Sequence, residues 1–149
     1  MSAHSPLPLV ISLAEKARDA IARQAATAAK LVDEARAQLE ALRRYRGEYL
    51  ARSVRQAEHD AAELANFAAF MGRLEAAIVQ QERTVEHHRA RAEALRGEWT
   101  KAAIKVKSLE ALAASRARDA RRAADRIERK TEDEHASRIA RDSPLRNAF

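Results

Sequence analysis

The sequence predicts an all-α protein in which two long helices form an antiparallel, left-handed coiled coil, the longer second helix carrying a C-terminal overhang. The composition favours helices, because 36 of the 149 residues are alanine and only 4% are aromatic. No proline interrupts the 135 residues between Pro8 and Pro144. Apolar residues recur at alternating spacings of three and four, the repeat that produces a left-handed supercoil. We therefore expect residues 1–149 to form a single coiled-coil hairpin.

The first helix is expected over about residues 8–51. Ten of the twelve positions along its packing seam are apolar. The seam consists of Val10, Ala14, Ala17, Ile21, Gln24, Ala28, Leu31, Ala35, Gln38, Leu42, Tyr45 and Tyr49. Its two glutamines are expected to fix the register of the coil, as polar seam residues do, and Gln38 is also a candidate docking residue.

The chain is expected to reverse over about residues 52–60, where the repeat lapses. Asp60, followed three residues later by Glu63, is typical of a capping box that starts a helix. Because the connection is short, we expect the helices to pack antiparallel. If the two helices are aligned antiparallel with Tyr49 opposite Phe67, Val10 lies opposite Val106.

The second helix is expected over about residues 61–142, followed by a frayed tail at residues 143–149. Twelve of its fourteen seam positions are apolar. They are Phe67, Met71, Leu74, Ile78, Gln81, Val85, His88, Ala92, Leu95, Trp99, Ala102, Val106, Leu109 and Ala113. Beyond Ala113 the seam becomes small and polar, so about 30 residues are expected to have no partner within the chain.

The residue types needed for catalysis or for metal binding do not converge in this sequence. There is no cysteine, no glycine-rich phosphate loop and no nucleophile motif. His87 and His88 are adjacent, so their side chains point about 100° apart on a helix instead of meeting at one ion. A two-helix hairpin also lacks a cleft that excludes water. We expect no catalytic residue, no metal, no cofactor and no enzymatic activity.

The charge and hydropathy patterns bear on location and partners. No apolar run approaches the roughly 20 residues that cross a bilayer, so a cytoplasmic protein is expected. The net charge of +6 allows an acidic protein, a nucleic acid or an anionic membrane as partner. The basic run from Arg116 to Arg129 is interleaved with acidic residues, which repel phosphates. A solvated helix or a protein partner is therefore favoured over nucleic acid.

The apolar stripe near the hairpin end is wider than a two-helix coil needs. Its residues are Phe67, Phe70, Met71, Leu74, Ala77 and Ile78. One interpretation is a tip that packs more thickly against its own loop. The other is an exposed patch where another protein docks. Both remain open at this point.

Short matches along nearly the full length resemble the FliJ family of flagellar type III export proteins. They comprise Leu13-Ala14-Glu15-Lys16; Gln38, Leu42, Tyr45, Glu48 and Tyr49; Phe70, Leu74-Glu75 and Ala77-Ile78; Trp99; and Lys130, Asp133-Glu134, Ala136 and Arg138. Each match is weak alone, and their order and spacing carry the resemblance. The related stalk of an injectisome is the alternative system.

The resemblance implies a stalk-like coiled coil at the inner face of the membrane at the flagellar base. Its implied partners are the hexameric flagellar export ATPase, the cytoplasmic part of an export-gate membrane protein, and export chaperones. The implied gate-binding surface is Gln38, Leu42, Tyr45, Tyr49, Phe70, Leu74, Ala77 and Gln81. The implied ATPase-ring-binding end is Glu15, Lys16, Arg122, Arg126, Lys130, Asp133, Glu134 and Arg138. A monomer is expected when the protein is free.

Two other functions compete with this interpretation. One is a generic homo-oligomeric scaffold in which the overhangs of two chains pair. The other, less favoured, is a basic helical nucleic-acid binder, which requires a steep dependence of binding on salt.

Overall fold

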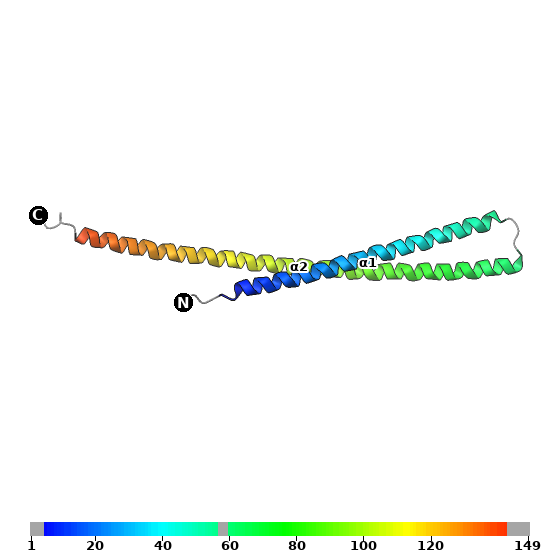
Figure 1. The fold of residues 1–149 in the computed structure, drawn as a ribbon, viewed down its shortest axis with the longest axis horizontal. Coiled ribbons are helices and arrows are strands. Elements are labelled where there is room, and N and C mark those ends of the chain that lie inside the picture. The colour runs from blue at the N-terminus through cyan, green and yellow to red at the C-terminus, as the bar shows by residue number, and fades with distance from the viewer. Residues whose placement is uncertain (1–4, 57–59, 143–149) are drawn as a thin grey trace. The chain divides into compact units, whose positions relative to one another are not determined.

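The computed structural model describes residues 5–56 and 60–142, and these form two α-helices. Helix α1 spans Leu7–Arg55 and helix α2 spans Ala61–Arg141. No β-strand occurs among the described residues. Figure 1 shows α1 in blue to cyan and the longer α2 in green to red. The predicted all-α class, with an antiparallel helix pair and a longer second helix, is confirmed.

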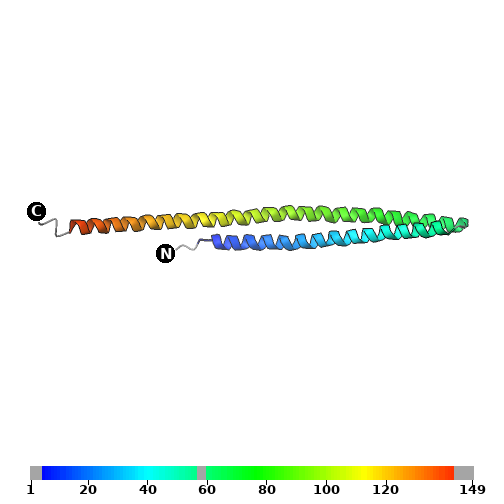
Figure 2. The same cartoon turned by 90° about the horizontal axis from the view of Figure 1, so that it is seen from above.

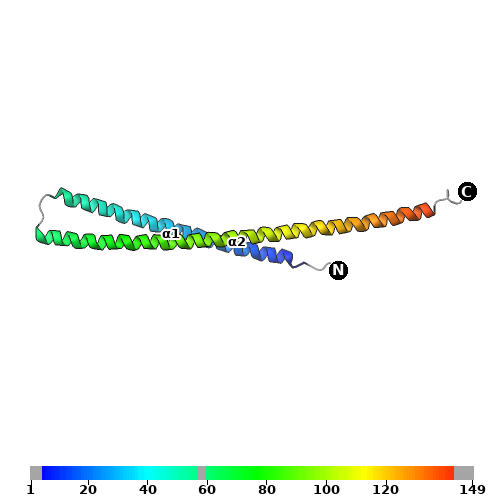
Figure 3. The same ribbon diagram turned by 180° about the vertical axis from the view of Figure 1, so that it is seen from behind.

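The chain divides into two compact units. The hairpin unit comprises Leu13–Ile104, and the terminal unit comprises Met1–Ser12 together with Lys105–Phe149. Both helices contribute to both units. In the hairpin unit α1 and α2 run side by side in opposite directions, as the three ribbon views agree (Figures 1, 2 and 3).

Helix α1 begins with a serine cap and a proline. The backbone N–H of Leu7 donates to Ser5 Oγ at 3.3 Å, as expected of an N-cap residue. Pro6 directly precedes α1, and its carbonyl accepts the N–H of Val10. Pro8 lies in the first turn of α1, where a backbone N–H has no partner within the helix, so its missing N–H costs little. Both prolines therefore lie where an α-helix tolerates them.

The reversal begins later than the lapse of the repeat suggests. Helix α1 continues to Arg55, not to about residue 51, because losing the apolar seam removes packing but does not break the backbone ladder. Arg52 and Arg55 lie in its last turn, where positive charge interacts favourably with the helix dipole. Residues 57–59 of the predicted reversal and the predicted tail at 143–149 lie outside the described residues.

Helix α2 begins where the capping signal predicts. Asp60 Oδ1 accepts the backbone N–H of Glu63 at 2.7 Å, and its carbonyl accepts the N–H of Leu64. This is the geometry of an aspartate N-cap. The helix then runs to Arg141, one residue short of the predicted end.

Buried side chains from both helices form the core of the hairpin unit. Leu39 on α1 packs with Leu74 and Ile78 on α2, and partly buried side chains surround them. The surrounding residues are Leu42, Phe70, Met71 and Val85. Because the core is a single line of side chains between two helices, each buried residue carries a large share of the packing.

The seam of α1 differs from the prediction by one residue at every second position. Val32 and Leu39 are buried, whereas the predicted Leu31 and Gln38 are exposed. The predicted positions Ala14, Ile21, Ala28, Ala35, Leu42 and Tyr49 are buried or partly buried. These shared positions fit two heptad patterns, one completed by Leu31 and Gln38 and the other by Val32 and Leu39. The second pattern puts more branched apolar side chains into the core. The exposed predicted positions lie along one edge of the helix pair.

The seam of α2 follows the prediction closely. Of its predicted positions in the hairpin unit, every one except Trp99 is buried or partly buried. In the terminal unit Leu7 and Val106 are buried, whereas every residue from 116 to 142 is exposed. Val10, predicted to face Val106, is itself exposed. The described C-terminal part of α2 thus presents a solvated helix surface.

Candidate functional site

Four aromatic rings cluster where α1 and α2 of the hairpin unit approach their connection. Tyr49 is the centre of this ring cluster: it stacks on Phe67 at a centroid distance of 5.4 Å and lies 4.4 Å from Phe70. Tyr45 and Phe70 form an edge-to-face pair with their ring centroids 6.0 Å apart. Such offset and edge-to-face contacts add stability beyond simple area burial. The predicted pairing of Tyr49 with Phe67 is therefore present.

The predicted gate-binding residues all belong to the hairpin unit but differ in what they offer a partner. Gln38, Tyr45 and Ala77 are exposed, and the Tyr45 side chain is the largest of them at 45% exposure. Leu74 is buried in the core. The partly buried members are Leu42, Tyr49, Phe70 and Gln81. A partner that docks without opening the hairpin therefore makes its largest contacts with Gln38, Tyr45 and Ala77.

The two glutamines of this surface bond to each other. Gln81 Nε2 on α2 donates to Gln38 Oε1 at 3.1 Å and to the backbone carbonyl of Ala35 at 3.0 Å. An amide nitrogen carries two hydrogens, so both bonds can form together. The pair satisfies a polar group at the seam and penalises slippage between the helices, which is the register role expected for a polar seam residue.

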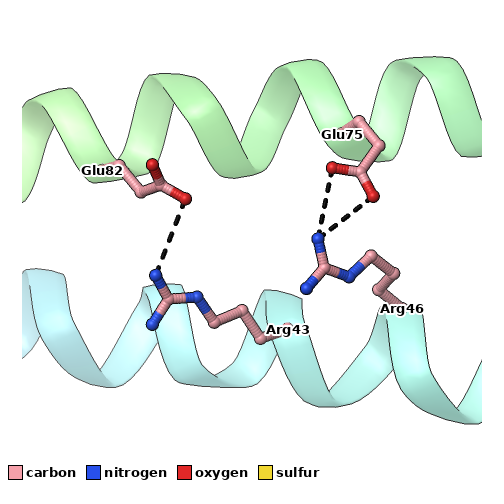
Figure 4. Close-up of polar contacts among 4 residues, drawn as sticks. All are labelled: Arg43, Arg46, Glu75 and Glu82. Atoms are coloured by element: carbon pink, nitrogen blue, oxygen red, sulfur yellow. Dashed lines mark hydrogen bonds and ion pairs between the residues drawn. The ribbon is translucent and has the colours of Figure 1, made fainter.

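The opposite edge of the hairpin unit is charged. Arg46 Nη1 contacts the two carboxylate oxygens of Glu75 at 3.0 and 3.2 Å, and Arg43 Nη2 lies 3.6 Å from Glu82 (Figure 4). Each pair joins α1 to α2. Exposed ion pairs contribute little stability, about 0–1 kcal/mol each, but they favour one pairing of the helices over others. One edge of the hairpin unit thus carries the aromatic residues, and the opposite edge carries these ion pairs.

The predicted ATPase-ring-binding residues are divided between the two units. Arg122, Arg126, Lys130, Asp133, Glu134 and Arg138 lie on α2 in the terminal unit and are exposed. Glu15 and Lys16 lie on α1 in the hairpin unit, Glu15 partly buried and Lys16 exposed. Among residues 116–142 the one ion pair is a loose contact of 4.0 Å between Arg122 and Asp119. The charges of this segment are therefore largely available to solvent or to a partner.

The histidines do not assemble a metal site in the described part of the chain. The rings of His87 and His88 lie 5.6 Å apart, and residues 5–56 and 60–142 contain no group of three potential ligands. Beside them Arg89 forms two hydrogen bonds to the Glu86 carboxylate, at 2.8 and 2.9 Å. These bonds lower the pKa of Glu86 and raise that of Arg89, since each favours the charged form of its partner. This is a solvent-exposed pair within one helix.

Neither α1 nor α2, over the residues described, has a stretch long and apolar enough to cross a membrane. Residues 3–144 match the model of a protein family whose description is "Flagellar FliJ protein". The chain belongs to the FliJ family. FliJ proteins are non-enzymatic components of flagellar type III export, and this chain shares that general role. Searches of curated proteins and of solved structures gave no significant match.

Two residues of the α2 seam differ from the sequence-based expectations. Phe67, which the sequence placed in the wide apolar stripe but not in the implied gate-binding surface, belongs to the ring cluster through its stacking on Tyr49. Trp99 occupies a seam position yet remains exposed, because it faces the small side chains of Ala22 and Ala25 across a shallow groove. The alanine-rich composition of this part of α1 was the signal for that exposure.

Proposed function

We propose that this protein is the stalk-like subunit that binds the hexameric flagellar export ATPase and couples it to the export gate. The observation that carries the proposal is the exposed helix of residues 116–142, which presents many charges and no apolar core of its own. A second surface, the aromatic edge around Tyr45, supplies the gate contact. The chain itself supplies binding energy and no chemistry.

The aromatic edge has the composition of a protein-docking surface. Tyrosine and phenylalanine are rigid anchors that recur in the energetically important centres of interfaces. The exposed face of Tyr45 is held by its edge contact with Phe70, so docking immobilises little additional side chain. Ala77, also exposed, adds a small apolar contact on α2. The buried Leu74 supports this edge from beneath instead of touching the gate protein.

The charged segment of α2 is proposed to contact the ATPase ring. Its candidate residues are Arg122, Arg126, Lys130, Asp133, Glu134 and Arg138, and Glu15 and Lys16 on α1 are proposed as a separate group. A ligand that binds some states of a ring better than others shifts the ring among those states. Contacts of this kind change nucleotide occupancy and hence ATP turnover without a catalytic residue from this chain.

The gate contact is tested by replacing Tyr45. We expect Tyr45→Ala to weaken binding to the purified cytoplasmic part of the gate protein at least tenfold, with helicity unchanged. Leu50→Ala is the matched control, because Leu50 is exposed to a similar extent at 41% but lies elsewhere on the α1 surface. Binding that survives Tyr45→Ala at native helicity, or falls equally in both variants, removes the proposed gate surface.

The ring contact is tested with charge reversal on α2. We expect the double variant Arg122→Glu/Arg126→Glu to abolish stimulation of ATP hydrolysis and of hexamer formation by the export ATPase. The control is Lys30→Glu/Arg36→Glu, the same change in charge on exposed residues of the hairpin unit. An ATPase that responds equally to the wild type and to both variants contradicts a ring contact at this segment.

The same proposal includes chaperone escort and a peripheral position on the inner face of the membrane. It also predicts a monomer when the protein is free. The competing scaffold function is favoured by one observation, the exposed Ile127 and Ile139 on α2. Light scattering separates the two, because a mass that rises with concentration supports the scaffold and a constant monomer mass contradicts it.

A further inference from the structure

An alanine-rich stretch of α1 leaves a groove along the hairpin unit. Six of the ten residues from Ala20 to Ala29 are alanine. The groove has a volume of about 440 Å³ and lies between this stretch and α2. Ala28 and Leu95 are the buried members of its lining, while Leu31 at its rim remains 41% exposed. Short side chains on α1 thus leave part of the apolar surface uncovered.

The groove lies along an edge of α1 that the buried seam leaves open. Gln24 and Leu31, seven residues apart, follow this edge and are exposed, whereas Val32 in the seam is buried. A two-helix coil needs only a narrow apolar seam, and further apolar surface beside the seam is typical of a helix that packs against two neighbours. The exposed Leu31 and the alanine stretch therefore offer apolar surface to a further helix.

The charges at the groove all have one sign. Arg23 and Arg91 line it, and no acidic residue is among its eight lining residues. Within residues 5–56 and 60–142 neither arginine forms an ion pair, in contrast to Arg43 and Arg46 further along α1. Unpaired guanidinium groups beside an apolar groove favour a carboxylate-bearing partner, since charge complementarity steers association and fixes orientation.

We propose that this groove binds an amphipathic, acidic helix from a partner protein, which completes a local three-helix packing. Apolar side chains of the incoming helix cover Leu31 and the alanine stretch, as in helix-in-groove recognition. Its flanking carboxylates pair with Arg23 and Arg91, one on each helix of the hairpin. The surface goes beyond the gate and ring contacts and shares no residue with either set.

The probe is a synthetic peptide of three heptads with leucine at the a and d positions and glutamate at the flanking e and g positions. A second peptide carries lysine at those flanking positions. Fluorescence anisotropy of the labelled peptides measures binding to the full chain at 150 mM salt. We expect the acidic peptide to bind saturably and the basic peptide to bind at least tenfold more weakly.

Two variants localise the binding. Leu31→Asp is expected to weaken the acidic peptide at least tenfold, whereas Val79→Asp, at an equally exposed residue of α2 outside the groove, leaves it unchanged. Arg23→Glu/Arg91→Glu alters no buried residue and is expected to reverse the preference toward the basic peptide. Circular dichroism confirms that each variant retains the wild-type helicity.

Three results overturn the proposal. One is the absence of saturable binding of the acidic peptide to the wild type. Another is equal weakening by Leu31→Asp and Val79→Asp, which places binding outside the groove. The third is an unchanged peptide preference in Arg23→Glu/Arg91→Glu, which removes the charge recognition.

Discussion

Replacing Ile78 with alanine tests how much of the hairpin's stability rests on its narrow core. Ile78 is 2% exposed and packs in one cluster with Leu39 and Leu74. The change deletes three carbons, and at about 0.8 kcal/mol for each buried carbon the lost transfer free energy is about 2.4 kcal/mol. The cavity left behind adds to this, so we expect the free energy of unfolding to fall by about 3 kcal/mol.

The assay is urea unfolding followed by circular dichroism at 222 nm. We expect a lower midpoint for Ile78→Ala with a similar slope, which reports lost stability and not a change in exposed surface. Val79→Ala is the matched control, because the neighbouring Val79 is 44% exposed and its truncation should cost less than about 1 kcal/mol. Equal effects of the two substitutions would refute the packing of α2 through Ile78.

Three further substitutions test the register, a helix start and the uninterrupted helix. Val32→Asp should unfold the hairpin unit or lower its free energy of unfolding by about 3 kcal/mol or more, because it buries a charge. Leu31→Asp should retain wild-type helicity, because Leu31 is exposed. Equal stability of the two variants would contradict the burial of Val32 in the seam. Asp60→Ala should cost about 1 kcal/mol by thermal unfolding, since it removes the cap of α2, and Asp60→Asn should retain most of that stability. Gly72→Ala should stabilise by about 1 kcal/mol, because a Cβ there meets open space on a helical backbone; a loss in the same unfolding assay counts against an uninterrupted α2.

The fold was largely predictable because it depends on periodicity. The proline-free run and the seven-residue repeat specify two long helices, and the Asp60 cap marks the start of α2 within one residue. The end of α1 was not predictable from the seam, because a helix persists after its apolar face ends when no proline or glycine breaks it. The apolar pattern predicts which residues contact the other helix, whereas the ends of a helix depend on where the backbone hydrogen bonds stop.

The packing face of α1 shows a different limit. Leu31 and Val32 are adjacent apolar residues, and either one completes a three-and-four spacing with Ala28 and Ala35. The structure buries Val32 and exposes Leu31. A single sequence with a wide apolar stripe does not distinguish these choices, because the choice depends on the facing side chains of α2.

The candidate docking surface was predictable in place but not in detail. The aromatic residues do gather near the reversal, with Tyr49 against Phe67 and Phe70. The burial of Leu74 and the bond between Gln38 and Gln81 depend on the register of the two helices, which spacing alone leaves ambiguous. The groove at the alanine-rich stretch likewise emerges only when small side chains on α1 are paired with specific neighbours on α2.

The register of α1 against α2 in the hairpin unit supports every surface described above, and spin-label distances test it directly. The chain has no cysteine, so labels attach only at introduced sites. Arg43→Cys/Glu82→Cys marks a pair in contact across the helices, whereas Arg43→Cys/Arg96→Cys displaces one label by fourteen residues, about 21 Å along α2. We predict that the second mean distance exceeds the first by about 13 Å, given helices about 10 Å apart. Equal distances, or a longer first distance, would contradict the antiparallel register.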